Sequence, residues 1–212
     1  MDVAILAPEK SGSHLVRGII EYLTQANTLD ARGTPINNSA HHIFETKYTD
    51  YVASLSHHAI TVDQRMREKS LVLLIRNPVE SIASNLKLGG NVSPSRINRK
   101  WHNSVLPMVS LFQQWHNPKM LIFYEDLLSN PEIEIKRLGD FFKVTPYRVN
   151  ELISRYDIIN NYCYDNLPQK GKSRDDFLYY TKRFHMWGIK LDVPKGLGIH
   201  VHFPEIYPLI LN

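Results

Sequence analysis

Residues 3–15 have the sequence VAILAPEKSGSHL, in which five apolar residues give way to a short polar turn. The apolar run predicts a buried strand over residues 2–7, because it is continuous and ends at Pro8. Residues 14–26 then place apolar side chains at helical spacing, namely Leu15, Val16, Ile19, Ile20 and Leu23. The stretch therefore predicts a strand, a turn and a helix, in that order.

Two more strands lead into helices in the same way. LVLLI at residues 71–75 predicts a strand buried on both faces, and the Asn77-Pro78 pair is typical of a helix start. MLIFY at residues 120–124 predicts another strand, and Asn130-Pro131 opens a helix with one apolar face. That face consists of Ile135, Leu138, Phe141 and Phe142. Three such units predict a parallel sheet.

Two weaker elements complete the sheet. Residues 51–56 suit a further strand, and residues 62–69 suit a short crossover helix. We therefore expect an α/β fold, a three-layer, doubly wound parallel sheet of about four or five strands. No repeat or flexible linker divides the chain, so residues 1–212 are expected to form a single domain, with loops at residues 30–40 and 88–95.

The composition limits the class of protein. The 25 Lys and Arg residues exceed the 21 Asp and Glu residues, which gives a net charge of +4 and favours an anionic small ligand over nucleic acid. The basic stretches at residues 65–69, 96–100 and 170–174 are typical of solvated faces. A lone cysteine, Cys163, cannot form an intrachain disulfide, and no apolar run approaches the length of a membrane helix. We expect a soluble, cytoplasmic protein.

The turn after the first predicted strand suits an anion. It contains a lysine, a glycine and two serines, and backbone N–H groups at the start of a helix attract a phosphate or sulfate. It is not an ordinary P-loop, because Lys10 precedes the glycine and no Gly-Lys-Ser/Thr follows at the start of the helix. Since ligands of such sheets lie beyond the carboxyl ends of the strands, the turns at His57-His58, Arg76-Asn77 and Glu125-Asp126 belong to the same candidate site.

Three of these turns carry a recognisable set of motifs. EKSGSHL at residues 9–15 is similar to Pro-Lys-Ser-Gly-Thr-Thr-Trp, and Arg76-Asn77-Pro78 ends a strand eight residues before Ser84. Tyr124-Glu125-Asp126 closes a later strand. In order and strand context the motifs resemble those of the sulfotransferases that use 3′-phosphoadenosine 5′-phosphosulfate. The resemblance covers residues 2–144 and implies a P-loop NTPase-like fold.

The resemblance implies a role for each matched residue. Lys10 would lie against the phosphosulfate and stabilise charge on the departing oxygen. Arg76 and Ser84 would hold the 3′-phosphate, and Tyr124 would contact the adenine. Donors to the 5′-phosphate would be Ser11, Gly12, Ser13 and His14.

The chain departs from the family pattern at Glu9, where proline is usual, at Leu15, where a tryptophan often stacks on adenine, and at His14, which replaces a threonine. Tyr156 is one alternative partner for the base. The family's general base is commonly a histidine that ends the strand before the Arg-Asn-Pro strand. His57 fits that place best, with His58 a close second.

A last family element closes over the 3′-phosphate near the C-terminus. Lys195 and Gly196 resemble it in order, and Lys170-Gly171 is a rival match. No metal is expected, since neither His41-His42 nor the His200 and His202 pair has a helical ligand spacing.

The predicted function is in-line transfer of a sulfuryl group to a hydroxyl or amine, leaving adenosine 3′,5′-bisphosphate (PAP). The acceptor would be a small molecule or a saccharide, selected by loops over residues 30–50 and 88–117. The alternatives are a P-loop kinase with an atypical loop and a non-catalytic protein that binds a nucleotide or anion. The oligomeric state and the identity of the acceptor cannot be derived from these motifs.

Overall fold

The computed structural model describes residues 3–31, 33–34, 49–59, 69–76 and 99–160, and the single positions 81 and 95. Within these residues one parallel sheet has the strand order β2-β3-β1-β4-β5. Its strands are β1 (Val3–Leu6), β2 (Asn27–Asp30), β3 (Tyr51–Ser56), β4 (Ser70–Ile75) and β5 (Lys119–Phe123). The predicted α/β fold with a parallel sheet is confirmed.

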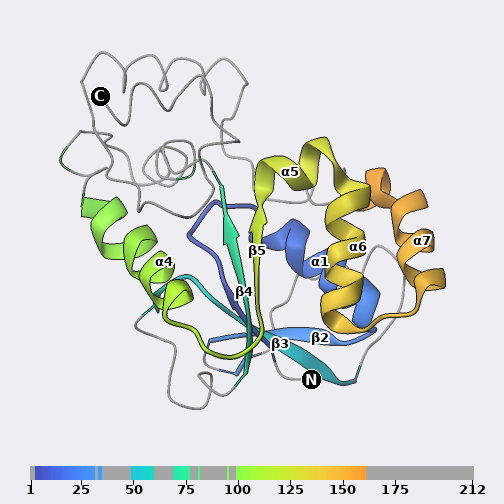
Figure 1. Ribbon diagram of the computed structural model, residues 1–212, viewed down its shortest axis with the longest axis horizontal. Helices are drawn as coiled ribbons and strands as arrows, with labels where there is room; N and C mark the ends of the chain where they lie inside the picture. Colours follow the sequence, from blue (N-terminus) through green and yellow to red (C-terminus); the bar gives the residue numbers. More distant parts are fainter. Residues whose placement is uncertain are drawn as a thin grey trace.

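Helices cover both faces of the sheet. Figure 1 shows α1 (Ser13–Thr24), α6 (Pro131–Phe142) and α7 (Pro146–Ser154) on one side and α4 (Leu106–Gln113) on the other. The alternation of side chains along a strand explains the two layers, because Val3 and Ile5 join the core under α1 while Ala4 and Leu6 are buried on the opposite face. The predicted three-layer arrangement is therefore present.

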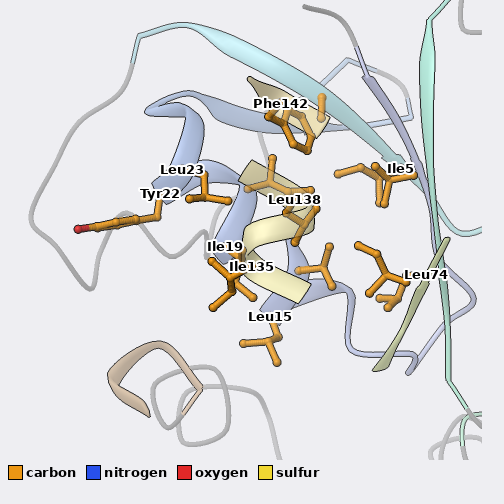
Figure 2. Packing of buried hydrophobic residues seen from close by; sticks show 14 of the residues in the cluster. Ile5, Leu15, Ile19, Tyr22, Leu23, Leu74, Ile135, Leu138 and Phe142 are labelled. Atoms are coloured by element: carbon orange, nitrogen blue, oxygen red, sulfur yellow. The ribbon is translucent and has the colours of Figure 1, made fainter. Parts of the chain in front are cut away.

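The larger core forms between the sheet and the helices on the α1 side, and it includes Val149 and Leu152 of α7. All five apolar residues predicted for one face of α1 are buried. Figure 2 shows the packing of Ile5, Leu15, Ile19, Leu23, Leu74, Ile135, Leu138 and Phe142. This packing places the N-terminus of α1 at the end of β1.

The sequence did not predict strand β2. The expected helix over residues 14–26 ends at Thr24, since Gln25 has a left-handed backbone (φ 54°), and Asn27–Asp30 pairs with β3. The four residues of β2 lack an apolar alternation, and the strand lies at the edge of the sheet. The predicted helix end at residue 26 was therefore wrong, residues 27–29 carried no prediction, and Asp30 belongs to a strand and not to the expected loop.

A buried polar network fastens β2 to α1. The Arg17 Nε donates to Thr28 Oγ1 (2.6 Å), and the Thr28 backbone N–H donates to Glu21 Oε1 (3.1 Å). Arg17 Nη2 lies 3.4 Å from the same Glu21 oxygen, and all three residues are at most 1% exposed. Hydrogen bonds within this charged group replace the apolar contacts that usually hold a strand in place.

Two further predictions need correction. Tyr124 does not end a strand: β5 stops at Phe123, and Tyr124 begins the short helix α5 (Tyr124–Ser129). Much of the loop expected over residues 88–117 is helical, with the π-helix η4 (Trp101–Val105) running into α4. Val105, Met108 and Val109 are buried, which explains why this segment folds onto the sheet.

The remaining elements divide into those confirmed and those outside the described residues. Strands β3 and β4 and the helix opened by Asn130-Pro131 are confirmed, and α7 was not predicted. The helix expected over residues 62–69 lies outside the described residues apart from Lys69. Of the helix expected after Asn77 the structure describes only Ser81, which is helical and buried. No helix in the described part of the chain combines the length and the apolar character needed to cross a membrane.

Candidate functional site

The carboxyl ends of four neighbouring strands bring the predicted site residues to one edge of the sheet. The loop of residues 7–12 follows β1, and His57 and Arg76 follow β3 and β4, which flank β1 on either side. Tyr124 follows β5, the next strand outward. This edge is where parallel sheets bind ligands.

The β1–α1 loop (residues 7–12) is a tight turn held by its own backbone. The Ser11 N–H and Oγ both donate to the Pro8 carbonyl oxygen, at 3.1 and 2.6 Å. Lys10 and Gly12 have left-handed backbones, with φ values of 64° and 90°. Ser11 is fully buried, so its two donors shape the turn.

Helix α1 begins at this turn with its first N–H groups directed back along the helix axis. Leu15 and Val16 make the first helical bonds, both to the Gly12 carbonyl oxygen, at 3.0 and 3.3 Å. The N–H groups of Ser13 and His14 precede these bonds and are the ones a helix offers to an anion.

Arg76 and Tyr124 close over the turn from the neighbouring strands. Arg76 Nη1 donates to the Lys10 carbonyl oxygen (3.2 Å), and the guanidinium carbon lies 4.9 Å from the centroid of the Tyr124 ring. The same ring packs so closely on Gly12 that a Cβ there would overlap its Cδ2 and Cε2 atoms. Lys10, Gly12, Arg76 and Tyr124 thus form one contiguous group.

The structure separates the two candidate histidines. His57 Nδ1 lies 2.7 Å from the Ala7 carbonyl oxygen, and because a carbonyl only accepts, Nδ1 carries the hydrogen. A neutral His57 therefore has its acceptor at Nε2. The His58 side chain is exposed, while its backbone N–H donates to Ser56 Oγ (3.1 Å) and its carbonyl accepts from the same hydroxyl (2.7 Å).

His14 is neutral over the physiological range. Burial lowers its pKa to about 4, with further contributions from the positive charges of Arg17, His57 and Lys10. These neighbours place His14 in the electrostatic field of both the loop and His57.

An ion pair that the sequence did not indicate joins the loop to the segment before η4. Lys100 Nζ lies 2.9 Å from Glu9 Oε2, and the two side chains are 35% and 37% exposed. The residues are 91 positions apart, so no local pattern connects them. The only signals were an unusual Glu9 in the loop motif and a basic stretch that was interpreted as solvated.

Several predicted residues do not take part in this group. Tyr156 is buried and its hydroxyl donates to the Leu127 carbonyl oxygen (2.8 Å), and Leu15 lies in the core. The positions outside the described residues are Ser84, Lys195, Gly196 and the rival pair Lys170-Gly171. Across the described ranges, no group of three His, Cys, Asp or Glu side chains has an arrangement that could hold a metal ion.

Comparisons with known proteins give matches by structure alone. No protein-family model and no curated protein matches the chain. A mouse sulfotransferase complexed with PAP has a TM-score of 0.50 and 14% identity, over 73% of this chain and 63% of that one. The chain thus spans less than two thirds of the length of that enzyme.

Retinol dehydratase gives similar matches. Its complex with androsterone and inactive cofactor PAP has a TM-score of 0.57 and 13% identity, over 88% of this chain and 79% of that one. Its complex with retinol and PAP has a TM-score of 0.54 and 12% identity, over 91% and 83%. The five-stranded parallel sheet and these matches agree, and the chain has the P-loop-like α/β fold of the PAP-binding sulfotransferases.

Proposed function

We propose that the chain is a sulfotransferase that moves a sulfuryl group from 3′-phosphoadenosine 5′-phosphosulfate to a hydroxyl or amine. The observation that carries the proposal is the group formed by Lys10, Gly12, Arg76 and Tyr124, because three separate sequence motifs meet in it. The shared sheet edge alone would bring the turns near one another, but Arg76 also contacts both Lys10 and Tyr124, so residues of the three motifs touch directly.

The donors in this group suit an anionic nucleotide. The N–H groups of Ser13 and His14 would bind the 5′-phosphate, with the Lys10 ammonium beside it. The Arg76 guanidinium is a planar fork of N–H donors that suits a phosphate, and its bond to Lys10 O holds it beside the loop, so it would contact a 3′-phosphate. Tyr124 would border the adenine, and Ser11 would act through the shape of the turn.

The phosphosulfate, when bound, supplies an activated sulfuryl group. The chain's own part is to position it and to move one proton. His57 Nε2 would accept the proton of the acceptor hydroxyl, while the bond from Nδ1–H to the Ala7 carbonyl oxygen fixes the ring and its tautomer. Lys10 would stabilise the negative charge that develops on the departing oxygen.

The acceptor is proposed to be a small molecule or a saccharide. The complexes of retinol dehydratase with retinol and with androsterone support the small-molecule class. Residues 88–117, which we propose as one of the segments that select the acceptor, include the helices η4 and α4. We propose a cytoplasmic enzyme that uses no metal.

Nucleotide titration tests the function. Calorimetry should give tighter binding for PAP than for ATP, and labelled phosphosulfate should transfer its sulfuryl group to at least one acceptor in a panel of phenols and saccharides. Preference for ATP would identify a P-loop kinase instead. PAP binding with no turnover on any acceptor would identify a non-catalytic nucleotide-binding protein.

Arg76→Ala refines this test. Loss of a donor to a charged phosphate should weaken PAP binding by about 1.5–3 kcal/mol. The variant also loses the bond to Lys10 O, so adenosine 5′-phosphosulfate, which lacks the 3′-phosphate, measures that part alone. Equal losses for the two ligands would mean that Arg76 only supports the loop.

A further inference from the structure

The ion pair between Glu9 and Lys100 places a carboxylate in a loop that, on the proposed function, holds a multiply charged anion. Glu9 directly precedes Lys10, and its Oε2 accepts a hydrogen bond from Lys100 Nζ at 2.9 Å. Both side chains are about one third exposed, so the pair is neither fully solvated nor fully buried.

A carboxylate at this position is electrostatically unfavourable in two ways. It would repel an anion bound at the turn that Glu9 itself belongs to. It is also the nearest anionic side chain in sequence to Lys10, and an ion pair between the two would withdraw the ammonium from the ligand. Pairing with a different cation removes both effects.

We propose that Lys100 is a positioning residue for the β1–α1 loop: it neutralises the Glu9 carboxylate and leaves the Lys10 ammonium available to the bound anion. This inference rests on the proposed function, since it assigns the regulation of affinity at that same site. Lys100 acts through Glu9 and does not itself touch the ligand. Its importance should therefore disappear when Glu9 carries no charge.

A double-mutant cycle measures this dependence, with PAP as the titrated ligand. Lys100→Gln should weaken PAP binding about 10-fold at low salt, and less at high salt. Glu9→Gln should bind at least as tightly as the parent. The double variant Glu9→Gln/Lys100→Gln should return to within about twofold of Glu9→Gln, because no carboxylate is left to neutralise.

The chain offers a matched control on α6. Lys136 makes the same kind of pair with Glu132 at 2.7 Å, and both side chains are exposed. Lys136→Gln removes the same charge from the whole molecule, so its effect on PAP affinity should stay within about twofold. Turnover gives a second readout. Lys100→Gln should lower kcat as well, and the added Glu9→Gln substitution in the double variant should restore it.

The outcomes distinguish direct from indirect action. A double variant that binds PAP as weakly as Lys100→Gln would show that Lys100 binds the anion itself, and would overturn the proposal. A Lys100→Gln variant with the same PAP affinity as Lys136→Gln would also overturn it. If Lys100→Gln fails to fold, Lys100→Arg should keep parental affinity, because the arginine can still pair with Glu9. A Lys100→Arg variant that folds but loses affinity also counts against it.

Failure of the proposed function has its own signature. If the parent chain does not bind PAP, the nucleotide assignment is wrong, and the same cycle is measured with inorganic pyrophosphate. The same pattern with pyrophosphate would support the role of Lys100 at a general anion site. If pyrophosphate does not bind either, both proposals are overturned.

Discussion

Replacing Gly12 by alanine should destabilise the chain by two separable effects. The first is the backbone, because φ at Gly12 is +90° and a residue with a Cβ pays about 1–2 kcal/mol in the left-handed region. The second is steric, because the new Cβ would overlap the Tyr124 ring, and overpacking costs about 1–3 kcal/mol. Together they predict a loss of about 2–5 kcal/mol in the free energy of unfolding.

Gly33 provides the control that separates the two effects. Its φ is +82°, but among the described residues, its chain neighbours aside, no atom lies within 4 Å of an added Cβ, so Gly33→Ala should pay only the backbone cost. Urea denaturation of both variants measures the difference. The double variant Gly12→Ala/Tyr124→Leu should recover part of the steric loss, since the smaller side chain leaves room. If Gly12→Ala is no less stable than Gly33→Ala, the close contact between the loop and Tyr124 is refuted.

Three further outcomes follow from the candidate site. Lys10→Ala should lower kcat far more than it weakens PAP binding, because the ammonium acts on charge that develops during transfer; unchanged turnover at saturating donor would exclude that role. His57→Asn should reduce turnover by about 100-fold or more with PAP affinity intact, while His58→Asn should keep most activity, and the reverse ranking in the same assay would make His58 the base. The pKa of His14 is lowered from 6.5 to about 4, chiefly by burial, so the unfolded chain binds more protons than the folded chain between these pH values. The contribution of neutral His14 to the free energy of unfolding is therefore fully present above pH 6.5 and is lost as the pH falls through 4. His14→Asn should reduce that loss of stability by at most about 3 kcal/mol, and by less where solvent screens the imidazole. Urea unfolding of parent and variant at pH 7 and pH 4.5 measures the loss, and equal losses in the two proteins would contradict the prediction.

The core of the fold could be predicted because its signals are local. The apolar face of α1 repeats at helical spacing, and the apolar run LVLLI in β4 matches a strand buried on both faces. Strand β2 gave no such signal, since Asn27–Asp30 is held by polar groups on α1. Segment 101–113 was missed because its burial depends on the sheet beneath it.

The sequence could predict which turns contribute to the site, but not the contacts between them. Parallel strands present their carboxyl ends at one edge, so consecutive turns had to lie together. The sequence could not decide between His57 and His58, because adjacent residues differ only in which way they point. Nor could it find the contact between Gly12 and Tyr124, which depends on how closely two loops approach.

The network of Arg17, Glu21 and Thr28 has a consequence for how this protein can change over evolutionary time. Each member is buried and bonded to the other two, so removing Arg17 or Glu21 alone would leave an uncompensated charge in the interior, at a cost of about 3–5 kcal/mol. Replacing all three together by apolar residues of similar volume carries no such penalty. Homologous chains should therefore show these positions covarying as a set, either all polar or all apolar, and the apolar set should mark lineages in which the edge strand keeps its register by hydrophobic packing.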